Sequence, residues 1–148
     1  MVLRPMRVED VDFALAIEIA AAEFPWSRCH FISSLEVKDH ASIIEVNNSV
    51  VGFAIFKPVL CETTLLNIAV HPHYQRKGYA RQLLEQGLIA QVNQGVVRCF
   101  LEVRQSNSDA RSLYHSLGFI QIAQRKNYYP AKSSPEHAIV MICEFPQV

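Results

Sequence analysis

The sequence predicts one domain of the α/β (α+β) class, with a mixed, mostly antiparallel sheet of six to seven strands flanked by about four helices. Two observations support this. Apolar runs of strand length follow one another closely between residues 42 and 70, which is typical of an antiparallel meander. A long helical period then leads into another strand-like run at Val97–Val103, so the strands on either side of the helix should form one parallel crossover pair.

The N-terminal part is expected to form a short strand and two helices. Leu3–Val8 is the strand, and Glu9-Asp10 places acids at the following helix start, where the helix dipole favours them. The inner face of this helix is expected to be Val11, Leu15, Ala16 and Ile19. Phe24-Pro25-Trp26-Ser27 ends the helix, and Ser27 can cap a second one that reaches about residue 37. Trp26 could pack under its loop or form one wall of a substrate groove.

The middle of the chain is expected to form the meander. Residues 42–46 and 51–60 are strands of a hairpin, because Asn47-Asn48-Ser49 between them tolerates positive φ. Gly52 inside the second strand would permit a bulge or a close backbone approach. The third strand is expected at residues 63–70 after a short turn.

The predicted crossover helix covers about residues 76–93, although Gly87 within it costs about 1 kcal/mol relative to alanine. The parallel strands on either side would end together at one edge of the sheet. Ligands in open α/β sheets bind beyond such strand ends, where both the loop 75–80 and Glu102 fall.

The C-terminal part is expected to form one more helix and two strands. Ser106 or Asn107 caps the helix, and Gly118 ends it. Its inner face would carry Ala110, Leu113, Tyr114 and Leu117. Residues 119–123 and 137–145 are the last two strands.

Composition narrows the functional class. A chain of 148 residues suits a single domain, 1–148, and a formal net charge of zero argues against a nucleic-acid-binding protein. No stretch is long and apolar enough to span a bilayer, and the amino terminus does not resemble a signal peptide, so we expect a cytoplasmic protein without a membrane partner. The four cysteines are widely spaced and are expected to be buried free thiols. No metal site is expected, since His71 and His73 flank Pro72 and cannot easily aim at one ion.

The segment Gln75-Arg76-Lys77-Gly78-Tyr79-Ala80 could bind a diphosphate. It opens a helix, whose first N–H groups lack partners, and small residues leave those amides accessible. Arg76, Lys77 and Arg81 add positive charge. The alternative is a basic turn that opens a solvated helix.

This segment, with the strand before it, resembles the coenzyme A pyrophosphate loop of the GNAT superfamily of N-acetyltransferases, Gln/Arg-x-x-Gly-x-Gly/Ala. The chain is also similar to the RimI-type ribosomal-protein-alanine N-acetyltransferases. Five blocks carry that resemblance: Phe24-Pro25-Trp26-Ser27; Asn67-Ile68-Ala69-Val70 through Gly78; Leu101-Glu102-Val103-Arg104 with Ser106-Asn107; Ala110 with Leu113-Tyr114 and Ser116-Leu117-Gly118-Phe119; and Arg125 with Asn127-Tyr128-Tyr129-Pro130. The departures are His71 and His73 where acids are common, Ala80 in place of Gly, and His137 in place of Asp.

The resemblance implies a GNAT fold, acetyl-CoA as cosubstrate and no metal. It implies Glu102 as general base and Tyr114 as general acid. Implied acetyl-CoA contacts are Ile68, Ala69, Val70, Arg76, Lys77, Gly78, Tyr79, Ala80, Arg81 and Asn107. The expected substrate contacts are Trp26, Tyr128 and Tyr129.

Each chemical role has a structural alternative. Glu102 could be a solvated strand-end carboxylate or a partner for Arg104, and Tyr114 could be a packed helix residue. Asn107 could hydrogen-bond the pantetheine arm or only cap its helix. A backbone N–H near Ala69 or Val70 could hold an oxyanion if the strand splays.

The implied substrate is the amino-terminal alanine of the eighteenth protein of the small ribosomal subunit, acetylated by direct transfer in a ternary complex. An α-amine with a pKa near 7.7–8.0 is roughly 10% neutral at pH 7, whereas a lysine is about 0.04% neutral, which favours the α-amine. The alternatives are a lysine or small-amine acetyltransferase and a non-catalytic acyl-CoA-binding module. A ribosomal protein is the expected partner, nucleic acid is not, and the expected state is a monomer or weak dimer.

Overall fold

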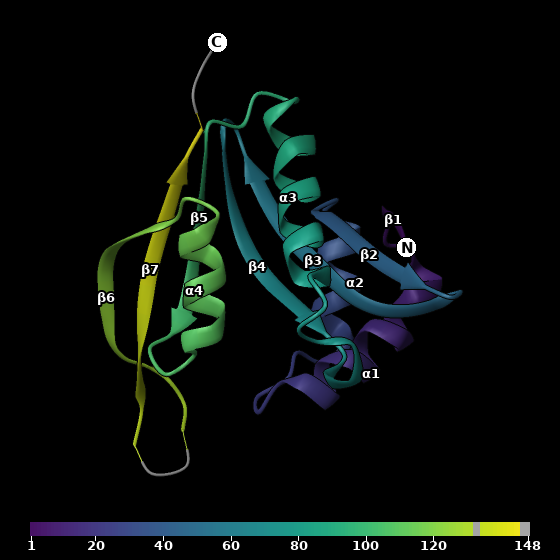
Figure 1. The fold of residues 1–148 in the computed structure, drawn as a ribbon, viewed down its shortest axis with the longest axis horizontal. Coiled ribbons are helices and arrows are strands. Elements are labelled where there is room, and N and C mark those ends of the chain that lie inside the picture. Colours follow the sequence, from purple (N-terminus) through teal and green to yellow (C-terminus); the bar gives the residue numbers. More distant parts are fainter. Residues whose placement is uncertain (132–133, 146–148) are drawn as a thin grey trace.

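The computed structural model describes residues 1–131 and 134–145, which fold around one seven-stranded sheet with strand order β1-β2-β3-β4-β5-β7-β6 (Figure 1). The strands are β1 (Val2–Pro5), β2 (His40–Val46), β3 (Ser49–Val59), β4 (Glu62–Val70), β5 (Arg98–Arg104), β6 (Ile120–Tyr129) and β7 (Glu136–Glu144). Only β4 and β5 run parallel; all other neighbouring strands are antiparallel. The predicted fold class is confirmed.

Four α-helices cover the sheet: α1 (Val11–Ala21), α2 (Arg28–Glu36), α3 (Tyr79–Val92) and α4 (Ser108–Ser116). Short 3-10 helices lie at Val8–Asp10 and Pro72–Tyr74. Helices α3 and α4 lie on one face of the sheet, and α1 and α2 lie on the other (Figure 1). Each face has its own apolar core, with Phe56, Leu84 and Tyr114 on the α3/α4 side and Ile17, Phe31 and Phe53 on the α1/α2 side. No described helix is long and apolar enough to cross a membrane.

The sheet divides between β4 and β5, and this division positions the site. The two strands pair only over residues 62–65 and 98–101. Beyond that point β4 stays paired with β3 as far as Val70, with Leu66 as an extra residue in the register, while β5 stays paired with β7 as far as Arg104. The carboxyl ends of the two parallel strands therefore separate into an opening. The predicted parallel crossover pair is confirmed.

Helix α1 is rotated from the predicted orientation. The buried residues are Val11, Ala14, Ile17 and Glu18, whereas Ile19 is 60% exposed. Leu15 packs against the core as a partly buried residue, but the prediction was wrong for Ala16 and Ile19, which are exposed. The helix has apolar residues on every side, so its period does not select one face. The side against the sheet is the one that carries Glu18.

Several element boundaries also differ from the prediction. Helix α3 starts at Tyr79 rather than near residue 76, because Arg76 and Gly78 have φ of 63° and 85°, which is incompatible with a right-handed helix. Strand β1 ends at Pro5 rather than Val8. Strand β6 continues to Tyr129, so Tyr128 and Tyr129 belong to a strand rather than to a loop.

Two glycines inside elements allow close packing. A Cβ at Gly52 would lie 3.0 Å from the carbonyl oxygen of Ala69, which confirms the predicted close approach. A Cβ at Gly87 would lie 2.8 Å from the ring of Phe56, so α3 needs glycine there to lie against β3. Gly87 therefore lowers the intrinsic helix propensity of α3 but allows the helix to pack closely on β3.

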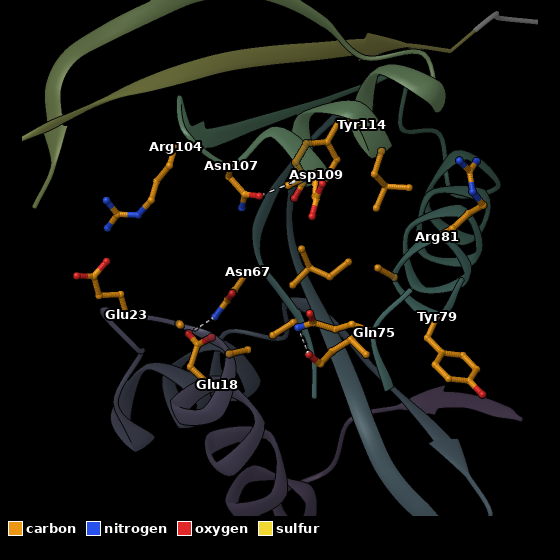
Figure 2. A pocket seen from close by; sticks show the side chains of 18 of the residues that line it. Glu18, Glu23, Asn67, Gln75, Tyr79, Arg81, Arg104, Asn107, Asp109 and Tyr114 are labelled. Atoms are coloured by element: carbon orange, nitrogen blue, oxygen red, sulfur yellow. Dashed lines mark hydrogen bonds between the residues drawn. The ribbon is translucent and has the colours of Figure 1, made fainter. Parts of the chain in front are cut away.

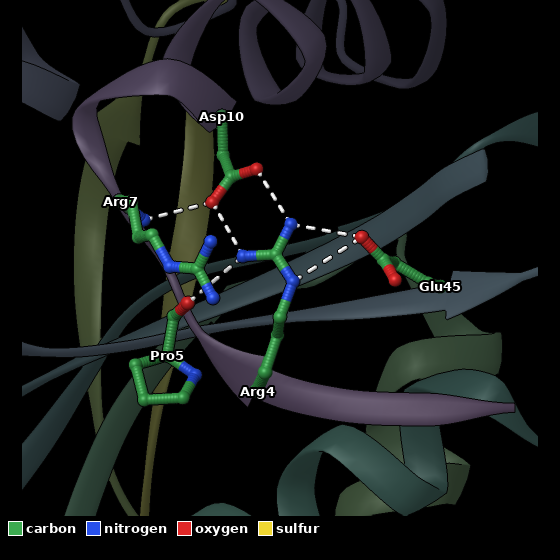
Figure 3. Close-up of polar contacts among 5 residues, drawn as sticks. All are labelled: Arg4, Pro5, Arg7, Asp10 and Glu45. Atoms are coloured by element: carbon green, nitrogen blue, oxygen red, sulfur yellow. Dashed lines mark hydrogen bonds and ion pairs between the residues drawn. The ribbon is translucent and has the colours of Figure 1, made fainter. Parts of the chain in front are cut away.

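A charged network fixes the N-terminal strand (Figure 3). The guanidinium of Arg4 donates two hydrogen bonds of 2.8 Å to Asp10, one to each carboxylate oxygen, and one of 2.8 Å to Glu45. The backbone N–H of Arg7 donates to the same Asp10. These hydrogen bonds, above all those from Arg4, lower the pKa of the buried Asp10 carboxyl.

The cysteines are free thiols, but only two of them are buried. Cys99 and Cys143 lie in strands and are buried, whereas Cys29 and Cys61 are exposed. The expectation of uniformly buried thiols was wrong for these two, because Cys29 lies on the outer side of α2 and Cys61 lies in the turn after β3.

Candidate active site

A cleft of about 910 Å³ opens where β4 and β5 part. It is lined by residues from α1 and its following loop, the end of β4, the loop 74–78, the first turn of α3, the end of β5 and helix α4. One end lies near Tyr79 and Arg81, and the other lies between Glu23 and Arg104 (Figure 2). The cleft therefore runs from the first turn of α3 to the loop after α1.

The edge of β4 supplies backbone donors to the cleft. The N–H of His71 donates to Val51 in β3 at 2.8 Å. Because successive residues of a strand direct their N–H groups to opposite edges, the N–H of Val70 points toward the open edge. Ile68, Ala69 and Val70 all line the cleft, and the carbonyl of Val70 accepts a hydrogen bond of 2.9 Å from Gln75 Nε2. Gln75 thus holds the loop against the end of β4.

The backbone N–H groups at the start of α3 are accessible from the cleft. Gly78 is the N-cap residue, with φ of 85°, and no atom lies within 4 Å of the position that a Cβ would take there. Arg76, Gly78, Tyr79, Ala80 and Arg81 line the cleft, whereas Lys77 does not. Such a helix start favours a negatively charged ligand.

Both cleft arginines of this region contact α4. The side chain of Arg76 pairs with Asp109 at 3.2 Å, and that of Arg81 donates to Ser116 Oγ at 2.6 Å. The Arg76–Asp109 pair is fully solvated and contributes little to stability. The guanidinium of Arg76 can therefore exchange its present partner for a ligand at low cost.

Helix α4 places two predicted site residues in the cleft. Asn107 caps the helix, because its side chain accepts the N–H of Ala110 at 3.2 Å. Tyr114 lies one turn beyond Ala110, is 6% exposed and packs against the ring of Phe119. Burial raises the pKa of the Tyr114 phenol, so it stays protonated and able to donate at neutral pH.

Glu102 lies on the other face of β5. Cys99, Leu101 and Val103 point into the core beneath α3 and α4, so by alternation Glu102 points to the α1/α2 side. It does not line the cleft, and its Oε1 accepts a hydrogen bond of 2.6 Å from Arg125. Its partner is therefore Arg125 of β6, not Arg104 as the structural alternative expected. Oε2 accepts no hydrogen bond from the described residues.

Aromatic rings form the end of the cleft near α1. Trp26 and Tyr129 line it, whereas Tyr128 lies outside it under the guanidinium of Arg125. Arg104 lies over the ring of Tyr129 at 4.6 Å and over that of Phe24 at 5.2 Å, joining the two sides. Burial, followed by the nearby charge of Glu102, raises the pKa of Tyr129 to about 12.

The histidines that depart from the RimI-type pattern have structural roles. His71 accepts the N–H of His73 at Nδ1, and the two rings contact edge to face. His137 Nδ1 accepts the N–H of Asn127 at 3.0 Å, which braces the β6–β7 hairpin. The described residues contain no cluster of three or more histidine, cysteine or acidic side chains that could hold a metal ion.

The sequence predictions missed several cleft residues, among them Glu18, Asn67, Gln75 and Arg104. Glu18 could have been found, because it stands seven residues after Val11 on the same side of a mostly apolar helix. Asn67, which interrupts an apolar strand, gave a similar signal. The sequence predicts Gln75 only as part of the diphosphate-binding segment and Arg104 only as an alternative partner for Glu102.

Comparison with known proteins identifies the family. Residues 11–119 match the model of the acetyltransferase (GNAT) family. The chain belongs to the GNAT family. Its enzyme class is therefore that of an acetyltransferase, as the sequence predicted.

Individual GNAT relatives extend the match over most of the chain. The chain is 42% identical over 136 residues to the [ribosomal protein bS18]-alanine N-acetyltransferase of Escherichia coli K12, covering 92% of each protein. It is 41% identical to the protein of that name from Haemophilus ducreyi, covering 90% of this chain and 92% of that one. The crystal structure of the ribosomal-protein-alanine acetyltransferase from Escherichia coli superposes with a TM-score of 0.95 at 39% identity, covering 99% of this chain and 95% of that one. Ard1 from Thermoplasma volcanium shares the fold, with a TM-score of 0.91 at 24% identity and coverage of 99% and 98%.

Proposed function

We propose that this GNAT protein transfers the acetyl group of acetyl-CoA to the amino-terminal alanine of ribosomal protein bS18, the eighteenth protein of the small subunit. The choice of substrate is supported by the 42% identity, over 92% of both chains, to an acetyltransferase that is named for that alanine. The cleft supports the proposal, because it runs from an anion-favouring helix start at α3 to a wall of aromatic residues near α1.

The cleft residues fit acetyl-CoA as cosubstrate. The open space at Gly78 and the amides of the first turn of α3 suit the diphosphate, with Arg76 and Arg81 as counter-charges. The unpaired edge of β4 and the side chain of Asn107 offer hydrogen bonds to the amides of a pantetheine arm. The N–H of Val70 is the donor we assign to the thioester oxygen, where negative charge develops during transfer.

Transfer requires three linked events. The neutral amine nitrogen forms a bond to the thioester carbon, the C–S bond breaks, and the electron pair of that bond goes to sulfur. We assign the proton lost by the amine to Glu102, whose unengaged Oε2 can receive it through a water molecule. We assign the proton gained by sulfur to the Tyr114 phenol, which burial keeps protonated.

An acetylation assay with chosen acceptors tests this function. Purified protein and acetyl-CoA are incubated with a peptide that begins Ala-Arg, with an amino-blocked peptide containing lysine, and with a small diamine. Mass spectrometry should locate the acetyl group on the α-amine of the first peptide. Acetylation confined to lysine or the diamine would replace the proposal with a different transferase. Acetyl-CoA binding without any product would indicate a binding module.

A further inference from the structure

Glu18 is a buried carboxylate that faces the cleft. It lies on the inner side of α1 and is 3% exposed. Its Oε2 accepts hydrogen bonds from the N–H of Trp26 at 3.0 Å and from Asn67 Nδ2 at 2.6 Å. Figure 2 shows Glu18 and Asn67 together on one side of the opening, with Asn107 and Tyr114 on the other. The carboxylate thus joins the loop after α1 to the separated end of β4.

The charge of Glu18 has no cationic partner among the described residues. Asp10, which is similarly buried at 5% exposure, is neutralised by the guanidinium of Arg4 through two hydrogen bonds. Glu18 forms no ion pair with residues 1–131 or 134–145, and its Oε1 accepts no hydrogen bond from them. A buried carboxylate is costly without an opposite charge. The fold therefore leaves a negative site in the wall of the cleft that an incoming cation can complete.

We propose that Glu18 binds the protonated α-amino group of the acceptor peptide, before the amine loses its proton to the catalytic machinery. This inference rests on the proposed function and names the residue that recognises the acceptor. Trp26 and Asn67 fix the carboxylate, so they act as positioning residues. A free amino terminus is the cation that fits, because it is the one charged group that every substrate of the proposed reaction carries.

Binding measurements can isolate the contribution of this charge. Calorimetry on the protein saturated with CoA gives the Kd of an Ala-Arg peptide and of its des-amino analogue, in which propionyl replaces alanyl. We expect the native protein at pH 6.5 to bind the amine peptide about tenfold more tightly. Glu18→Gln should lose this preference and leave the analogue's Kd unchanged.

Two controls separate binding of the peptide amine by the charge of Glu18 from stabilisation of the fold by its hydrogen bonds. Glutamine keeps an oxygen that can accept both hydrogen bonds, so Glu18→Gln should retain the Tm within a few degrees, whereas Glu18→Ala should not. Asp12→Asn removes one negative charge from the outer side of α1, where Asp12 pairs with Arg28 at 3.1 Å in solvent, and should retain the tenfold preference. An unchanged preference in Glu18→Gln would overturn the proposal, as would equal weakening of both peptides.

The native protein alone provides a second test. Among the described residues, no histidine, lysine or cysteine lines the cleft, so its charges change little between pH 6.5 and 9.0. The α-amine of the peptide has a pKa near 7.7–8.0 and is mostly neutral at pH 9.0. The tenfold preference should therefore nearly disappear at pH 9.0. A preference that persists there would show that another feature recognises the amine. Failure of the proposed function is distinct, because it would appear as absent acetylation of the amino terminus in the native protein.

Discussion

Arg125 donates a hydrogen bond of 2.6 Å to Glu102, and this pair lies beside the cleft rather than in it. The two residues come from β6 and β5, which are separated by β7, so the contact spans the outer half of the sheet. The guanidinium of Arg125 also stacks on Tyr128 at 3.9 Å. Tyr128 therefore fixes Arg125, and Arg125 in turn fixes the orientation of the Glu102 carboxylate. Glu102 Oε2 stays available to a water molecule.

Glu102→Gln should lower kcat about 100-fold or more, because glutamine cannot accept the proton of the amine. The KM for acetyl-CoA should change little, since Glu102 lies on the opposite side of β5 from the start of α3. Steady-state kinetics with the alanine peptide measures both. Glu144→Gln, which removes an exposed carboxylate at the far end of β7, is the matched control and should leave kcat unchanged. Near-native kcat in Glu102→Gln would exclude Glu102 as the base.

Tyr114→Phe should lower kcat at least about tenfold and preserve the fold, because phenylalanine keeps the packing on Phe119. Burial raises the pKa of Tyr114, so its protonated form persists to higher pH than that of a free tyrosine. Tyr114 should therefore not lose its proton near pH 10, and the kcat of the native protein should not fall there for that reason. A pH profile of kcat for both proteins checks this, and a fall near pH 10 confined to the native protein would contradict it.

Gly78→Ala should raise the KM for acetyl-CoA several-fold, because the new Cβ enters the open space at the start of α3. Alanine is also strained at φ of 85°. Gly95→Ala provides a control for that strain, since Gly95 has φ of 98°, an equally open Cβ position and no place in the cleft. Both variants should lose a similar amount of stability, but only Gly78→Ala should bind acetyl-CoA more weakly. Equal KM values in the two variants would remove the phosphate role from this loop.

Gly87→Ala should destabilise the protein by about 1–3 kcal/mol, because the added Cβ would lie 2.8 Å from the buried ring of Phe56. Helix propensity alone predicts the opposite, a gain of about 1 kcal/mol. Chemical denaturation of the two proteins gives the difference in free energy of unfolding. A gain in stability would show that α3 and β3 can move apart without cost.

Asp10→Asn should destabilise the protein by about 3 kcal/mol at pH 7, because it leaves the guanidinium of Arg4 without its main partner (Figure 3). The pKa of Asp10 is lowered in the folded state, so its stabilising effect is complete above the unfolded pKa near 3.9 and is lost as pH falls below it. Denaturation curves of both proteins should therefore converge below about pH 4. A constant difference from pH 7 to pH 3 would contradict this linkage.

The sequence predicted the elements whose signals are local. The Asn47–Ser49 turn, the glycine stop at Gly118 and the period change after Val70 depend on residues close together in the chain, and each element is present. The facing side of α1 was predicted wrongly, because this helix has apolar residues on every side and only its packing against the sheet selects Val11, Ala14 and Ile17. The partner of Glu102 was missed because Arg125 reaches it only once β6 has paired with β7.

The close contact of Gly87 in α3 with Phe56 in β3 also affects the position of the first turn of α3. Gly87 lies nine residues after Gly78, or about 13 Å along the axis at 1.5 Å per residue. Because α3 is one continuous helix from Tyr79 to Val92, an outward shift at Gly87 would also displace its first turn relative to β4. A substitution at Gly87, which does not line the cleft, would then be expected to weaken acetyl-CoA binding at the start of α3.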